Sequence, residues 1–204
     1  MVTAITPVDK RKSKVFLEEG FAFVLYRGEL EQFGIREGEE LEEETYLRIL
    51  REILMGRAKE RALYLLSASA KTESWMRQKL SQAGYPGEAV EYALNFLKEY
   101  HYIDDNAYVE SYIRSSGGKK SRRQMEFELR QKGVSKDLLR QALEEFPVDE
   151  EEGARELLMK RMKGKTGISR EEKNRLAAYL GRKGYSFDII NRVIKEFEAS
   201  CDSE

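Results

Sequence analysis

The sequence is poor in the residues that most often carry catalysis, metal binding or covalent cross-linking. Its 204 residues include one cysteine, Cys201, and one histidine, His101. A single cysteine excludes an intramolecular disulfide and is typical of a reducing compartment. The sequence has no cysteine and histidine cluster of the kind that holds zinc, and no glycine spacing of a phosphate-binding loop. We therefore expect no enzyme activity, no catalytic residue, no metal site and no cofactor.

Long apolar runs are also missing, and neither sign of charge is in clear excess. No segment has the length and hydropathy of a membrane span or a signal peptide, so we expect a cytoplasmic protein without a membrane partner. The formal net charge is −1, although 36% of the residues are charged. The charges are segregated, because the charged residues at 29–52 are mostly acidic whereas those at 111–136 and 154–184 are mostly basic. Such an asymmetry can orient a protein on a polyanion.

The N-terminal part has a different pattern from the rest of the chain. Aromatic and β-branched residues at 15–17 and 21–26 surround a turn at Gly20, which predicts a β-hairpin. Residues 2–8 can add a third strand at an edge, where Pro7 is tolerated. A small sheet is marginally stable alone, so we expect it to pack on an amphipathic helix from residue 43 to about residue 55.

A glycine-centred pattern then occurs three times, at Gly84, Gly133 and Gly184. Each glycine follows a leucine by four residues, and apolar residues recur at matching positions before and after it. This periodicity predicts a helix on each side of the glycine, which is the favoured residue just past a helix end. A further helix precedes each pair, at about 57–67, 105–115 and 150–163. In the second repeat, one helix should stop at Gly117 and Gly118 and the next should begin near Ser121.

The sequence therefore predicts a mainly α fold with three tandem three-helix repeats that form an elongated arc. A small N-terminal β-hairpin or sheet with a helix precedes the repeats. The predicted domains are the N-terminal extension at 1–56, the first repeat at 57–103, the second at 104–147, and the third with the tail at 148–204.

Basic residues gather where a loop enters the middle helix of the second repeat. Cations combined with the free N–H groups of a helix N-terminus favour phosphate binding. A similar basic loop occurs in the third repeat. The alternative is that these charges only solvate the surface, but their matching places in two repeats favour binding. The candidate DNA-binding residues are Lys119, Lys120, Arg122, Arg123, Arg130 and Lys132 in the second repeat and Arg161, Lys163, Lys165 and Arg170 in the third.

Each helix–glycine–helix corner also fits a helix-turn-helix DNA-binding transcription regulator. The helices that would read bases, at about 135–146 and 186–198, carry several acids. Acids repel phosphates and contact few bases, so base-specific reading is disfavoured, but this alternative stays open. Selection of a fixed sequence from random duplexes would favour it.

Three stretches in or at the start of the second repeat carry a family resemblance: residues 102–108 (Tyr-Ile-Asp-Asp-Asn-Ala-Tyr), 128–135 (Glu-Leu-Arg-Gln-Lys-Gly-Val-Ser) and 142–143 (Ala-Leu). With them, roughly residues 57–200 resemble the RecX family, regulators of the RecA recombinase, and the N-terminal part resembles the extension that some members carry. Members often have Gly-Pro where this chain has Ser121 and Arg122, and Glu-Leu where it has Trp75 and Met76.

The resemblance implies three tandem three-helix repeats that bind RecA filaments on single-stranded DNA. It implies modulation, usually inhibition, of filament growth, ATP hydrolysis and strand exchange, in DNA repair, recombination and the SOS response. From it we expect a monomer whose partners are the RecA filament, single-stranded DNA and, more weakly, duplex DNA.

Overall fold

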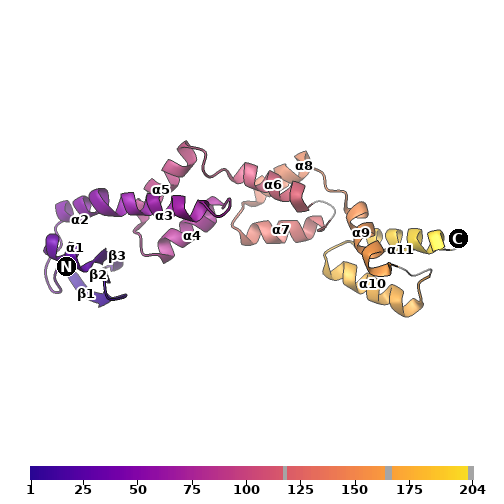
Figure 1. Cartoon of the computed structure of the whole chain (residues 1–204), viewed down its shortest axis with the longest axis horizontal. Helices are drawn as coiled ribbons and strands as arrows, with labels where there is room; N and C mark the ends of the chain where they lie inside the picture. Colours follow the sequence, from indigo (N-terminus) through magenta and orange to yellow (C-terminus); the bar gives the residue numbers. More distant parts are fainter. Residues whose placement is uncertain (117–118, 164–166, 202–204) are drawn as a thin grey trace. The chain divides into compact units, whose positions relative to one another are not determined.

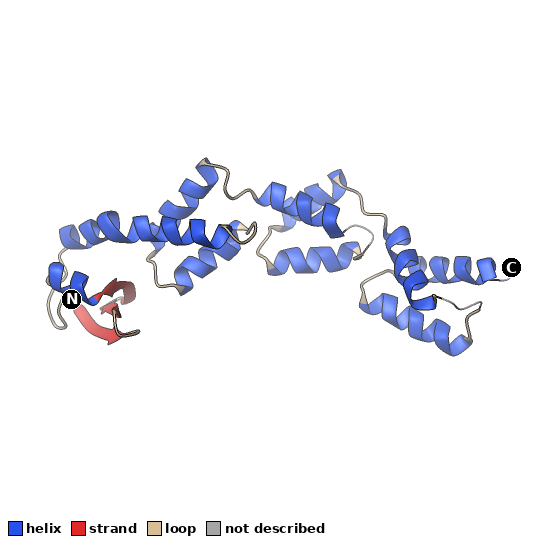
Figure 2. Ribbon diagram, in the orientation of Figure 1, coloured by secondary structure: helices blue, strands red, loops and turns tan. Residues whose placement is uncertain are grey.

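The computed structural model describes residues 1–116, 119–163 and 167–201, which form a small sheet followed by a succession of helices (Figures 1 and 2). The mainly α-helical fold with a small N-terminal sheet is confirmed. Gly117 and Gly118, where the sequence predicts a helix end, lie outside the described residues. In chain order the elements are β1 (Val2–Pro7), β2 (Lys12–Leu17), β3 (Gly20–Tyr26), α1 (Arg27–Gln32), α2 (Glu43–Ile49), the π-helix η1 (Leu50–Leu54), α3 (Met55–Leu66), α4 (Glu73–Gln82), α5 (Gly87–Glu99), α6 (Asp105–Ser116), α7 (Arg122–Gln131), α8 (Lys136–Glu145), α9 (Glu150–Met162), α10 (Arg170–Arg182) and α11 (Phe187–Cys201).

The three strands form an antiparallel sheet in the order β1-β2-β3. Pro7 ends the edge strand β1, a place where a residue without an N–H is tolerated. Successive side chains point to opposite faces of a strand, and Val15, Phe23 and Leu25 are fully buried. The rings of Phe23 and Tyr46 lie 5.9 Å apart, so the predicted packing of the sheet on the helix that follows it is confirmed.

That helix is longer than the sequence predicts. The pattern indicates separate helices before and after Gly56, whereas α2, η1 and α3 follow one another without interruption from Glu43 to Leu66. Leu54 and Ala58, on either side of Gly56, are both buried in the same core. Their burial favours helix on both sides and outweighs the backbone freedom that one glycine loses there. The i→i+5 hydrogen bonding of η1 widens one turn within the run.

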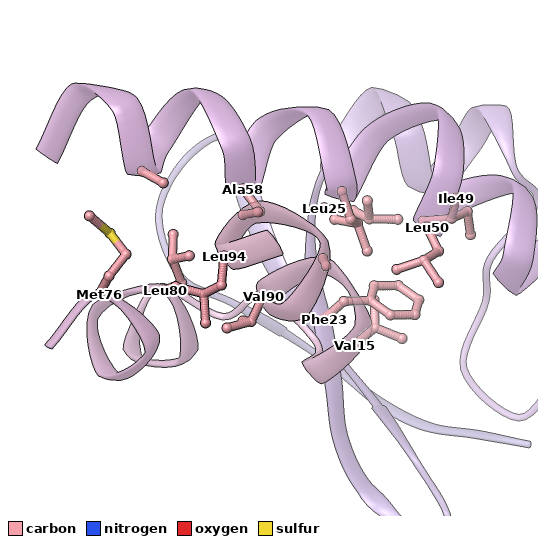
Figure 3. Close-up of a cluster of buried hydrophobic side chains, with 14 of the residues drawn as sticks. Val15, Phe23, Leu25, Ile49, Leu50, Ala58, Met76, Leu80, Val90 and Leu94 are labelled. Atoms are coloured by element: carbon pink, nitrogen blue, oxygen red, sulfur yellow. The ribbon is translucent and has the colours of Figure 1, made fainter. Parts of the chain in front are cut away.

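The chain divides into two compact units, Met1–Asp104 and Asp105–Glu204. In the first unit, the sheet and the helices share a core, and Figure 3 shows Phe23 of the sheet facing Leu50 of the helical run. The same core extends to α4 and α5, where Leu80 and Leu94 are fully buried. The first three-helix repeat is therefore continuous with the sheet in packing.

The second unit contains two separate hydrophobic clusters. Helices α6, α7 and α8 surround one of them, in which Val109 and Leu129 are fully buried. Helices α9, α10 and α11 surround the other, in which Leu158 and Leu180 are fully buried. Each three-helix repeat of this unit thus has its own small core.

The three aligned glycines have the backbone conformation that the repeat requires. Gly84, Gly133 and Gly184 have φ angles of 87°, 80° and 90°. Each directly follows the C-cap residue of a middle helix, and this left-handed conformation is strained for any residue with a side chain. The predicted role of the glycines as helix stops is confirmed.

The last of these glycines also joins the two repeats of the second unit. The Ser121 hydroxyl accepts a hydrogen bond from the Gln124 N–H at 3.1 Å, which caps α7, and donates one to the Lys183 carbonyl at 2.7 Å. A Cβ placed on Gly184 would lie 2.6 Å from the Ser121 Oγ. Because Ser121 is fully buried and held by both bonds, it cannot move aside without losing them.

We expect Gly184→Ala to destabilise the second unit by at least about 1 kcal/mol, since it adds left-handed strain to the clash with Ser121. The matched control is Gly181→Ala, one turn earlier in α10. There an added Cβ meets nothing closer than Ile190 at 4.0 Å, and alanine should stabilise the helix by about 0.5–1 kcal/mol. Urea unfolding followed by circular dichroism measures both. Equal effects of the two substitutions would contradict the close approach at Gly184.

Candidate nucleic-acid interface

Helix α7 positions most of the basic residues that the sequence singles out. Its buried face carries Met125 and Leu129, both fully buried, which fixes how the helix is rotated about its axis. The opposite face is therefore exposed, and Arg122, Arg123 and Arg130 lie on the exposed side. The predicted start of the helix at Ser121 is confirmed by its capping hydrogen bond.

Two of the predicted cations are paired with carboxylates. The Lys120 Nζ lies 2.6 Å from a Glu128 oxygen and 2.8 Å from the Tyr112 hydroxyl, and Tyr112 also donates a hydrogen bond to Glu128. The Arg122 Nε lies 3.1 Å from the Glu126 carboxylate, one helical turn away. These pairs lower the positive charge that the segment can offer to a phosphate.

The Lys120–Glu128 pair shifts the pKa of both groups. Burial raises the pKa of Glu128, but the hydrogen bonds from Lys120 and Tyr112 outweigh it, so the net shift is downward. Burial lowers the pKa of Lys120, and the hydrogen bonds to Glu128 and Tyr112 reverse that shift, so the net change is upward. Both groups are charged at neutral pH, and Lys120 has a structural partner in this unit.

Three other cations in the described part of this segment are available. Lys119, Arg123 and Arg130 are exposed and form no ion pair within residues 1–116, 119–163 and 167–201. Lys132 is exposed at the C-cap of α7. Arg123 and Arg130 lie on one face of the helix, where both line an open depression of about 590 Å³.

An aromatic residue that is not among the predicted site residues lies in the same depression. Phe127 is 63% exposed, between Arg123 and Arg130 on the helix surface, and Glu126 and Gln131 complete the lining. The exposure of Phe127 could have been predicted from the sequence. Phe127 lies two residues from both Met125 and Leu129, so it is outside the buried stripe of the helix. The depression combines an aromatic face with two cations.

The basic residues of the third repeat are placed less uniformly. The Arg161 guanidinium lies 4.6 Å from the centre of the Tyr179 ring. Lys163 follows α9 and Arg170 begins α10, and both are exposed. Lys165 lies outside the described residues. The structure therefore places three of these four predicted residues, and one of the three is stacked on a tyrosine.

The described ranges contain neither a candidate metal site nor a candidate membrane-spanning helix. Within them, no three histidine, cysteine, aspartate or glutamate side chains come close enough together to hold a metal ion. None of the helices described there combines the length and apolar character needed to cross a bilayer.

Comparison with known proteins gives the same family from sequence and from structure. Models of the first, second and third three-helix domains of RecX match residues 58–97, 104–143 and 149–194. A protein of Bacillus licheniformis named regulatory protein RecX is 30% identical over 95% of this chain and 75% of its own length. The chain belongs to the RecX family.

Further RecX proteins match along nearly the whole chain. The regulatory protein RecX of Clostridium botulinum (strain Alaska E43) is 29% identical over 92% of this chain and 91% of its own length. A crystal structure of a regulatory protein RecX superposes with a TM-score of 0.61 at 29% identity, covering 96% of this chain and 98% of that one. The resemblance of the sequence to the RecX family is thus confirmed, including the three tandem three-helix domains.

We expect Glu128→Gln to lower the free energy of unfolding at pH 7 by about 0.5–1 kcal/mol, a small value because both partners are about one-third exposed. A carboxylate whose pKa is lowered on folding stabilises the protein above its unfolded pKa and loses that contribution as the pH falls through its folded pKa. The difference between wild type and variant should therefore shrink as the pH falls below the ordinary glutamate value of 4.5.

Urea unfolding at a series of pH values from about 7 to about 4 measures this difference. Glu126→Gln is the control on the same helix, since Glu126 pairs with the more exposed Arg122 and should matter less. A deficit of Glu128→Gln that stays constant down to the lowest pH would contradict the role of the charged pair.

Proposed function

We propose that the protein binds RecA filaments on single-stranded DNA and reduces filament growth, ATP hydrolysis and strand exchange. Membership of the RecX family carries this proposal, since all three three-helix domains of the family match in tandem. In this proposal the protein acts as a cytoplasmic monomer in DNA repair and recombination, without catalysing a reaction. It binds duplex DNA more weakly than the filament.

The exposed cations of α7 and of the loop before it support a contact with the DNA of the filament. Lys119, Arg123 and Arg130 can each neutralise one phosphate without breaking an ion pair, whereas Lys120 and Arg122 would first have to leave a carboxylate. We propose that the first three residues supply the central contact. Lys132 and the third-repeat residues Arg161, Lys163, Lys165 and Arg170 extend it.

A helix-turn-helix mode of DNA reading has less support. Helix α8 would enter the groove in that mode, yet it carries Asp137, Glu144 and Glu145, all exposed. Carboxylates on a reading helix repel phosphates and contact few base edges. We therefore favour the modulator of RecA over a transcription regulator.

The proposal predicts that the protein lowers the rate of DNA-dependent ATP hydrolysis by RecA in a concentration-dependent way. Charge reversal by Arg123→Glu together with Arg130→Glu should weaken this inhibition by about tenfold or more, because it removes two phosphate contacts and adds repulsion. The control pair is Arg27→Glu with Arg51→Glu, which changes the net charge equally at exposed positions in the first unit. Wild-type protein that leaves RecA hydrolysis unchanged at saturation would rule the proposal out.

The number of free cations also sets the salt dependence of DNA binding. If three phosphates are contacted, the affinity for single-stranded DNA should fall about 20-fold between 50 and 200 mM salt. Fluorescence anisotropy of a labelled strand over that range measures the slope. A slope near zero would show that the basic segment meets no phosphate, and a much steeper one would show that further cations, in the third repeat or in the pairs of Lys120 and Arg122, also meet phosphates.

A further inference from the structure

The exposed face of α7 carries a phenylalanine between two arginines. Phe127 is 63% exposed, and it makes no ring contact with any residue of the described ranges. Arg123 precedes it by four residues and Arg130 follows it by three, so the three side chains occupy neighbouring turns of one helix face. We call these three residues the α7 stripe.

The fold itself does not require the α7 stripe. The aligned positions of the other two middle helices are also exposed, so the difference is not a matter of burial. Those positions carry Ser74, Gln78 and Ser81 in α4, and Asn174, Ala178 and Gly181 in α10. A large apolar ring in water has a free-energy cost that a serine, glutamine or alanine avoids. The stripe is therefore a local addition to the shared helix, and its chemistry indicates a ligand.

We propose that the α7 stripe binds single-stranded DNA by stacking one unpaired base on Phe127 while Arg123 and Arg130 bind phosphates on either side. Seven residues of α-helix span about 10 Å, so two flexible arginine side chains can reach backbone on both sides of a stacked base. This inference deepens the proposed function, on which it rests for the choice of single-stranded DNA as partner.

The lining of the depression favours a nucleotide over other occupants. Beyond Phe127 it offers two arginines, the paired Glu126 and Gln131, and its volume is about 590 Å³. An apolar peptide helix would need several apolar side chains to anchor it, and only one is present. A nucleotide needs one aromatic face and cations for its phosphates, which the α7 stripe supplies. A duplex hides the faces of its bases in the stack, so only unpaired bases can use Phe127.

Anisotropy of a labelled 20-nucleotide thymidine strand, without RecA, tests the inference on the full chain. Phe127→Ala should weaken binding on the order of tenfold, whereas Phe127→Tyr should retain it. Phe187→Ala is the matched control, because Phe187 is 74% exposed but begins a different helix. The fold of Phe127→Ala is verified by circular dichroism, and no loss is expected at an exposed helix position where alanine is favourable.

A strand of the same length that lacks bases separates stacking from charge. Wild type should bind it on the order of tenfold more weakly than the thymidine strand, and Phe127→Ala should bind the two strands equally. Equal affinities of wild type and Phe127→Ala for the thymidine strand would overturn the inference, as would a wild-type protein that binds no strand.

The outcome is separable from that of the proposed function, since the strand assay contains no RecA. If Phe127→Ala loses the inhibition of RecA but keeps its affinity for the free strand, the α7 stripe contacts protein and the inference is wrong. If binding to the strand requires Phe127 but wild type leaves RecA hydrolysis unchanged, the inference stands and the proposed function fails.

Discussion

A single buried hydroxyl fixes both the start of α7 and the position of the corner that follows α10. The Ser121 Oγ accepts from the Gln124 N–H and donates to the Lys183 carbonyl, while Gly184 leaves no space for a side chain beside it. The hydrogen bond from Gln124 caps the N-terminus of α7. The hydrogen bond to Lys183 holds the third repeat against the second. Ser121 therefore fixes where α7 begins, while the buried Met125 and Leu129 set how the helix is rotated about its axis.

The cations of α7 and of the loop before it fall into two groups with different roles. Lys120 pairs with Glu128 and contacts Tyr112 of α6, which stabilises the contact between α6 and α7, whereas Arg122 pairs with Glu126 within α7. Arg123 and Arg130, on the exposed face, have no carboxylate partner in the described part of the chain. Counting basic residues along the sequence treats all of them as equal, and the structure separates them by what lies within reach of each side chain.

The helices, the corner glycines and the sheet could be predicted because each depends on short-range patterns. Leu129 and Met125 mark a buried stripe, and Gly133 ends the helix for a reason that is local to its backbone. The Arg122–Glu126 pair could also have been predicted, because the two residues are four apart in a helix. The contact of Lys120 with Glu128 could not be predicted, since it depends on how the loop before α7 folds back along the helix.

Two other features escaped prediction for different reasons. Phe127 carries a readable signal, but an aromatic residue in a helix invites assignment to the core unless its angular position is checked against Met125. The continuity of α2, η1 and α3 was not predicted, because a glycine such as Gly56 usually indicates the end of a helix. Its neighbours Leu54 and Ala58 are buried in one core, and only the tertiary packing shows that both sides of the glycine belong to the same helix.

The uninterrupted run from Glu43 to Leu66 has a consequence for how the first unit unfolds. Its N-terminal half rests on the sheet and its C-terminal half rests on α5, so neither half can fray without withdrawing support from the other. In native-state exchange, proteins open in roughly contiguous cooperative units, and we expect the sheet, the run and α5 to form one such unit. The strands should thus exchange their amide protons with the same opening free energy as α5. The N-terminal extension and the first repeat then unfold as one cooperative unit.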